Sequence, residues 1–162
     1  MTRARLVLVA VALGAAACDP GTTRPDLLPF PEARSFEVTR DRGAAIGLLA
    51  DRLRADTIPV GRVDTLDAWL ETPWFDAGTR RPVRGDHVGM QFVKLRAWAD
   101  PARPTHAELI VELAYRPVAD PSLPGRMLER PLPETHYFAR HLDSLLNRLQ
   151  AEVGFEPPAG AR

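Results

Sequence analysis

The chain has very little of the residue types on which many enzyme mechanisms depend. In 162 residues it holds one cysteine, Cys18, and three serines, Ser35, Ser122 and Ser144. None of the serines lies in a Gly-x-Ser-x-Gly or Ser-x-x-Lys pattern, and there is no glycine-rich phosphate loop. The common serine-nucleophile and nucleotide-binding classes are therefore not indicated, and we expect a protein that is not an enzyme.

The sequence also has little from which to build a disulfide framework or a metal site. Cys18 has no second thiol with which to pair, so an intramolecular disulfide is excluded. Zinc sites favour histidines four residues apart on a helix, whereas His136 and His141 are five apart. We expect no metal and no dissociable cofactor, with His136 at the start of a helix and His141 beside its apolar stripe.

No apolar run is long enough to cross a bilayer. A spanning helix needs about 20 apolar residues, and the run over residues 6–17 has 12. It follows a short cationic start, Met1-Thr-Arg-Ala-Arg5, and ends in small residues. This order is typical of a secretory signal peptide.

The lone cysteine follows this leader directly. The stretch Ala15-Ala16-Ala17-Cys18 resembles the lipobox of bacterial lipoproteins, in which an aliphatic residue and two small residues precede the cysteine; Ala15 stands where leucine is usual. The resemblance implies cleavage before Cys18, diacylglycerol on its sulfur and acylation of the new amino terminus. Two or more acyl chains anchor a protein stably. The alternative is an ordinary signal peptide followed by an incidental cysteine.

The leader predicts a location in the cell envelope. We expect a lipid-anchored protein at the inner or the outer membrane, facing the periplasm or the exterior; Asp19, after the cysteine, leaves the choice of membrane open. Removing residues 1–17 removes Arg3 and Arg5 and no acid, so 21 basic and 21 acidic residues become 19 and 21, a formal charge of −2. That balance is not the basic footprint of a nucleic-acid-binding protein.

The mature chain divides into three parts. Residues 18–33 hold the lipidated cysteine and a proline-rich tether, residues 34–154 form one α+β domain, and residues 155–162 are a disordered tail. Fully extended, the tether could hold the domain roughly 50 Å from the lipid at about 3.3 Å per residue. Alternatively, the Leu27-Leu28 pair and Phe30 pack back on the domain.

Periodicity along the domain predicts the order β-α-β-β-β-β-α. Strands are expected at 35–39, 58–63, 68–75, 88–99 and 105–116, and helices from a cap at Thr39 or Asp41 to near Asp56 and over 134–153. A turn is expected at 64–67, with a short helical turn at 66–70 as the alternative. Five prolines between 117 and 133 predict a loop without regular structure.

The strongest strand signal is the pair 88–99 and 105–116. Apolar and polar residues alternate strictly in the second segment, so one face of the pair is apolar. A turn centred on residue 102 specifies a register in which both the apolar and the charged residues find matching partners. The predicted pairs are Val93 with Val111, Leu95 with Leu109, and Arg96 with Glu108.

These elements predict an α+β fold, with a single antiparallel sheet of four or five strands and two helices packed on one face. The element order over residues 34–154 resembles the helix-grip arrangement of accessory lipoproteins of outer-membrane barrel assembly. The resemblance lies in element order alone, and it implies a scaffold role.

Aromatic residues on the predicted strands are the candidate binding residues. Phe92 and Trp98 share a face with Arg96, opposite the core-facing residues, and Trp74 lies on the preceding strand. Because a large apolar patch on a surface is typical of an interaction site, we predict partner binding by Trp74, Phe92, Arg96 and Trp98. The alternative is that the C-terminal tail, the 117–133 loop or the curvature of the sheet covers them.

Acidic residues cluster around the first hairpin, at Asp64, Asp67, Glu71 and Asp76. A carboxylate pair for glycoside chemistry needs one acid in an environment that raises its pKa. No such environment can be identified in the sequence, and charged residues at hairpin ends are usually solvated. We therefore predict no catalytic residue.

Together these observations favour a non-catalytic binding or scaffold subunit of a membrane-associated complex, with an envelope protein as partner. Two alternatives stay open. One is a carrier of a small ligand or lipid, held in a cleft between sheet and helix. The other is an enzyme of an unrecognised type.

Overall fold

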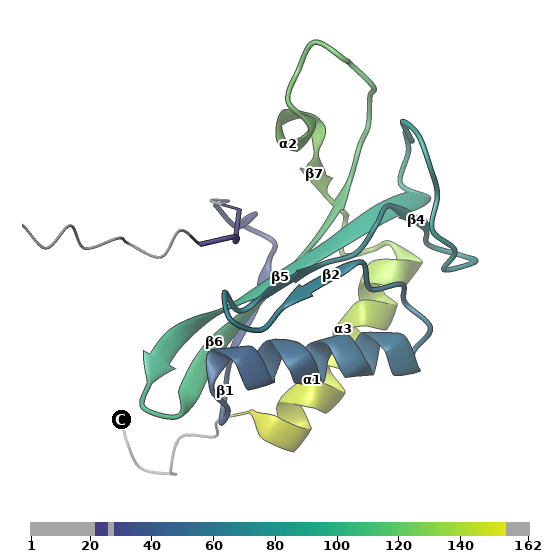
Figure 1. Ribbon diagram of the computed structural model, residues 1–162. Coiled ribbons are helices and arrows are strands. Elements are labelled where there is room, and N and C mark those ends of the chain that lie inside the picture. Colours follow the sequence, from purple (N-terminus) through teal and green to yellow (C-terminus); the bar gives the residue numbers. More distant parts are fainter. Residues whose placement is uncertain (1–21, 26–27, 155–162) are drawn as a thin grey trace, which may run out of the picture.

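A twisted antiparallel sheet is built around two long strands, β5 (Phe92–Arg103) and β6 (His106–Tyr115), which form a hairpin (Figure 1). The computed structural model describes residues 22–25 and 28–154. On one side β1 (Arg34–Val38) pairs with β6, and on the other β3 (Trp69–Glu71) and β2 (Arg62–Asp64) follow β5. Two short strands complete the sheet, β4 (Phe75–Asp76) on β5 and β7 (Arg130–Pro131) on β6.

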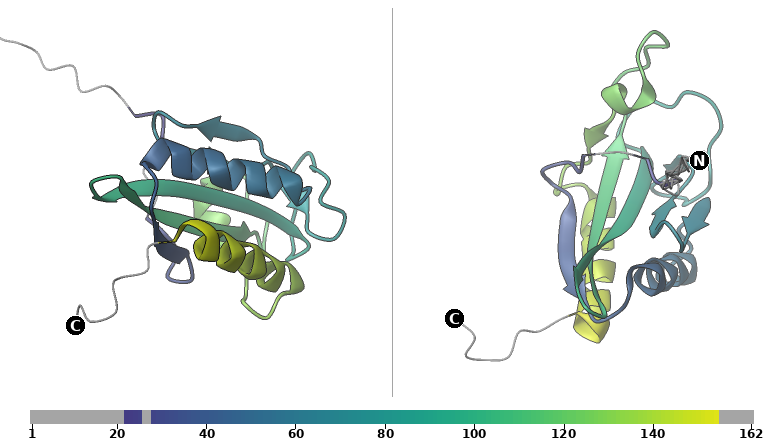
Figure 2. Two further views of the ribbon diagram at one scale, coloured as in Figure 1. Left: turned by 90° about the horizontal axis from the view of Figure 1, so that it is seen from below. Right: turned by 60° about the vertical axis from the view of Figure 1, so that its left-hand side comes forward.

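Two helices, α1 (Arg42–Ala55) and α3 (Tyr137–Val153), cover one face of the sheet (Figure 2). The Asp41 carboxylate caps α1 by accepting a hydrogen bond from the Ala44 N–H at 2.8 Å. Of the two predicted caps for this helix, Asp41 is therefore confirmed. His136 caps α3 through its Nδ1, which confirms its predicted place at the start of the helix.

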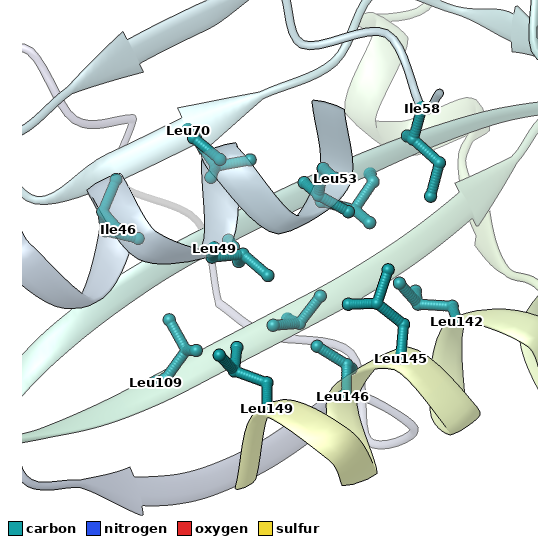
Figure 3. Packing of buried hydrophobic residues seen from close by; sticks show 14 of the residues in the cluster. Ile46, Leu49, Leu53, Ile58, Leu70, Leu109, Leu142, Leu145, Leu146 and Leu149 are labelled. Atoms are coloured by element: carbon teal, nitrogen blue, oxygen red, sulfur yellow. The ribbon is translucent and has the colours of Figure 1, made fainter. Parts of the chain in front are cut away.

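The core lies between this face of the sheet and the two helices (Figure 3). Leucine and isoleucine side chains at helical spacing point from both helices toward the strands, because each helix carries its apolar residues on one side. Burying one such side chain contributes about 1.5–3 kcal/mol. The members from the two helices include Ile46, Leu49, Leu53, Leu142, Leu145, Leu146 and Leu149, none more than 5% exposed.

The predicted α+β class, with one antiparallel sheet and its helices on one face, is confirmed. The count of elements differs, because the described residues hold seven strands and three helices. Pro73 breaks the predicted strand 68–75 into β3 and β4. Beside Pro73, the Thr72 side chain replaces a backbone acceptor in the hydrogen bonding to β5, since the Leu95 N–H donates to Thr72 Oγ1 at 2.9 Å.

The prediction of a loop without regular structure at 117–133 is wrong. This segment, which we call the arm, contains α2 (Gly125–Leu128) and β7 and lies at one end of the sheet (Figure 1). Leu128 and Leu132 are buried and fasten it. Proline is tolerated at Pro131 because β7 is an edge strand.

The predicted register of the long hairpin is also wrong, although the predicted faces are right. Val93 pairs with Tyr115 rather than Val111, a shift of four residues, and an even shift keeps each side chain on its face. The turn lies at Pro104 and Thr105, so Pro101 is inside β5. Its missing N–H costs no ladder bond because β3 pairs with β5 only as far as Trp98.

Candidate functional site on the outer face of the sheet

The predicted binding residues lie on or beside the sheet face that points away from α1 and α3, which we call the outer face. Arg96 and Trp98 stand on it in β5, and Phe92 is at the start of the same strand. Trp74 lies in the break between β3 and β4. The structure therefore brings the four residues to one face, in three different surroundings.

Arg96 lies at the centre of a group of buried ion pairs. Its Nε contacts Glu71 Oε2 at 2.6 Å, and its Nη1 and Nη2 contact the two oxygens of Glu129 at 2.6 and 2.9 Å. Nη1 also lies 3.4 Å from Glu112, the cross-strand neighbour that replaces the predicted Glu108. Arg96 is only 8% exposed.

Residues of the arm complete this group. Arg126 contacts both oxygens of Glu112 at 2.5 and 3.0 Å, and Glu129 accepts from Arg96. The two carboxylates are 1% and 2% exposed. These contacts join the arm to the middle of the sheet. We call the group the ionic cluster: Glu71, Lys94, Arg96, Glu112, Arg126 and Glu129.

The ionic cluster keeps its central groups charged. Burial lowers the pKa of Arg96, but hydrogen bonds and the charges of Glu129 and Glu71 outweigh burial and raise it above its usual range. Burial raises the pKa of Glu129, but Arg96 outweighs it and lowers that pKa below its ordinary value. Neither group is poised to exchange a proton near neutral pH, so the geometry favours fastening over acid–base chemistry.

Trp98 lies beneath an N-terminal segment, residues 22–25 and 28–30, which we call the strap. The Arg24 guanidinium is 5.4 Å from the Trp98 ring centroid and contacts Asp100 at 2.5 and 3.4 Å. Trp69, opposite Trp98 on β3, donates from Nε1 to Thr23 Oγ1 at 3.2 Å. Both tryptophans are 5% exposed.

The other end of the strap contacts the arm. The Arg126 guanidinium lies 3.9 Å from the centroid of the Phe30 ring and donates to the Leu28 carbonyl at 2.8 Å. Of the two predicted arrangements of the tether, Phe30 adopts the one that packs back on the domain. Leu28 stays 86% exposed, and Leu27 lies outside the described residues.

Trp74 and Phe92 are half-buried. The Arg116 guanidinium lies 4.8 Å and the Lys94 amine 5.4 Å from a ring centroid of Trp74, and the Phe92 ring packs on His87 at a centroid distance of 4.7 Å. The expectation of an exposed patch therefore needs correction for Arg96 and Trp98. The arm covers Arg96, which is one of the alternatives that the sequence left open. The strap covers Trp98, and sequence reasoning did not anticipate that cover.

The acidic residues of the first hairpin are divided among separate contacts. Asp64 and Asp67 accept hydrogen bonds from Thr23, Glu71 belongs to the ionic cluster, and Asp76 accepts from the N–H groups of its own turn. Backbone N–H groups lower the pKa of all three aspartates. A general acid needs the opposite shift.

Sequence reasoning missed a histidine–carboxylate pair. His141 Nε2 contacts Asp56 Oδ2, and Arg80 Nη2 lies 2.9 Å from the same nitrogen. The three residues are far apart in sequence, so no spacing could indicate them. The hydroxyl of Ser144, also on α3, donates to the Arg140 carbonyl at 3.0 Å rather than to this pair. The contact between His141 and Asp56 joins the end of α1 to α3.

Sequence reasoning also missed a group of exposed aliphatic side chains at the end of the sheet that carries the arm. They come from the loop before β5 and from the arm, and a pocket of about 230 Å³ lined by His87, Arg116 and Leu123 lies between the two segments. We call this surface the loop end. Its exposed side chains are Val88, Met90, Val118, Leu123 and Met127, each 40–59% exposed.

Among the described residues, no helix is long and apolar enough to cross a membrane, and no three side chains of metal-ligating type gather. The sequence matches no known protein-family model and no curated protein.

Proposed function

We propose that this chain is a lipid-anchored protein of the cell envelope, and that its domain is a non-catalytic binding or scaffold subunit of a membrane-associated complex. The leader that ends at Cys18 supports the anchor. The observation that carries the binding role is the loop end, where five aliphatic side chains stand exposed on two neighbouring segments. Exposed apolar surface of this kind is typical of protein interaction sites.

The covered outer face supports this choice of surface. The charged groups of the ionic cluster are paired with one another, and the strap lies over Trp98. Neither the cluster nor Trp98 is therefore free to contact a partner. Trp74 contacts Arg116 and Phe92 packs on His87, and Arg116 and His87 both line the pocket of the loop end. The same pairing of charges gives no support to the enzyme alternative, because it provides neither a nucleophile nor a proton donor near neutral pH.

The loop end also lies far from the start of the strap. Arg24 contacts Asp100 near the end of β5, and Phe92 begins that strand. Phe92 and Asp100 are eight residue steps apart along the strand, which is about 26 Å at roughly 3.3 Å per step. A surface at this distance from the anchored end suits a protein partner in the envelope better than the lipid itself.

Photocrosslinking in intact cells tests the loop end. A photoreactive residue at Leu123 should give a discrete adduct with an envelope protein, and Met90→Asp should remove that adduct by placing a charge on the same surface. The same probe at exposed Arg148 of α3 is the matched control and should give none. Absence of an adduct at 123 and at 118, or an adduct that Met90→Asp leaves unchanged, would contradict the proposal.

One observation favours the carrier alternative. A pocket of about 180 Å³ opens between β1 and β7 along β6, with Phe30, Leu113 and Leu142 among its lining residues. Pockets for drug-sized ligands have volumes of about 300–1,000 Å³. The volume of this pocket is below that range, so a lipid would need a larger pocket than the structure shows. A rise in melting temperature of the delipidated protein with envelope lipids would favour the carrier.

A further inference from the structure

Contacts of the strap hold the first described residues of the chain against the domain. Thr23 donates from its N–H to Asp67 and from its hydroxyl to Asp64 at 2.6 Å, and it accepts from Trp69 at 3.2 Å. Arg24 adds the ion pair with Asp100. The strap is therefore held against the turn between β2 and β3.

Chain length then limits where the proposed anchor can lie. Four peptide units join Cys18 to Thr22. Consecutive Cα atoms are about 3.8 Å apart, so the two Cα atoms are at most about 15 Å apart. An acylated Cys18 consequently brings the β2–β3 turn close to the lipid, whereas a tether free of the domain would not.

The turn presents an apolar side chain at its tip. Leu66 is 89% exposed, more than any other large apolar side chain among the described residues. The turn around it is rigid, because Asp64 Oδ1 accepts from the N–H groups of Leu66 and Asp67 at 3.1 and 3.0 Å. Gly43 of α1 packs against it so closely that a Cβ there would lie 2.5 Å from the Thr65 carbonyl oxygen.

A single exposed leucine is ordinary on a protein surface and by itself indicates nothing. Here its position coincides with the point to which a four-residue connection ties the domain. We propose that the β2–β3 turn faces the bilayer and that Leu66 contacts the lipid, so that the loop end points away from the membrane. This inference rests on the proposed lipid anchor and adds an orientation to it.

Fluorescence quenching in vesicles tests the orientation. Because acylation consumes the thiol of Cys18, Leu66→Cys or Leu123→Cys supplies the one free thiol for an environment-sensitive NBD label. The lipidated protein is placed on phosphatidylcholine vesicles that contain a nitroxide-bearing phosphatidylcholine. We expect loss of NBD emission at position 66 and unchanged emission at position 123.

A second variant tests the role of the strap. Replacing both Thr23 and Arg24 with alanine in the Leu66→Cys protein removes the contacts that hold the strap. We expect quenching at position 66 to weaken while vesicle flotation stays unchanged. Equal quenching with and without these contacts would show that the strap does not set the orientation.

The outcomes separate this inference from the anchor. If intact mass shows acylated protein that floats with the vesicles but position 66 is not quenched, or position 123 is quenched instead, the orientation is wrong and the anchor stands. If the mass shows no acyl chain on Cys18, both proposals fall.

Discussion

Replacing Arg96 with methionine should lower the free energy of unfolding by about 3–5 kcal/mol, the usual cost of removing one partner from a buried ion pair. Methionine keeps much of the side-chain volume but leaves Glu129 buried without its main partner, and it removes the longer contact to Glu112, which keeps its pairing with Arg126. Both carboxylates are almost fully buried, so water cannot replace the guanidinium. Urea unfolding followed by circular dichroism measures the change.

The pH dependence provides a second readout. In the parent protein the pKa of Glu129 is lowered below its ordinary value of 4.5, so the stability it contributes is complete above that pH and is lost as pH falls through the lowered pKa. In Arg96→Met, burial without the guanidinium should raise this pKa above its unfolded value. The difference in free energy of unfolding between the parent protein and the variant should therefore become smaller as the pH falls from about 7 to about 4.

Arg54→Met is the matched control. Arg54 pairs with Asp51 on the exposed side of α1, at 3.0 Å, with both side chains more than half exposed. Such surface pairs contribute about 0–1 kcal/mol, and the substitution should cost no more. Two results would show that the ionic cluster does not fasten the arm to the sheet. One is an equal loss of unfolding free energy in Arg96→Met and Arg54→Met. The other is a loss for Arg96→Met that stays the same size at acidic pH.

Phe138→Ala should also cost about 3–5 kcal/mol, through the cavity that truncation of a buried aromatic ring leaves. Phe138 is 1% exposed at the start of α3, and its ring and the Phe75 ring form a T-shaped pair with a centroid distance of 5.3 Å and an interplanar angle of 70°. This contact joins α3 to β4. The melting temperature and the urea midpoint should both fall.

The neighbouring aromatic residue is the control for this change. Tyr137 is 50% exposed, so Tyr137→Ala should cost less than about 1 kcal/mol, as is usual for surface positions. A loss for Phe138→Ala as small as that of the control would mean that α3 does not pack on the sheet as described.

The fold class could be predicted because period-two and helical patterns depend on burial alone. Alternation in β6 placed the right residues in the core, and Asp41 was a recognisable helix cap. The register could not be predicted in the same way, since two prolines, Pro101 and Pro104, each suggest a turn. Which of them lies in a strand depends on where β3 ends, and that is a tertiary property.

The candidate site was harder to predict than the fold. Alternation put Arg96 and Trp98 on the outer face correctly, but their burial depends on the strap and the arm, which carry no periodic pattern. Glu129 and Arg126 lie 33 and 30 residues beyond Arg96, in a proline-rich segment whose composition indicated a loop. Arg126 and Glu129 flank two apolar residues in that segment, and this was the only sequence signal that it packs on the sheet.

Intact mass spectrometry of the protein purified from the membrane fraction of a bacterial host tests the lipid anchor most directly. The proposal predicts a chain that begins at Cys18 and carries diacylglycerol on its sulfur, with the full-length precursor accumulating in the presence of globomycin. A Cys18→Ser variant should lose the lipid and leave the membrane fraction or remain unprocessed. A mature chain that begins at another residue, or one with an unmodified Cys18 thiol, would contradict the proposal.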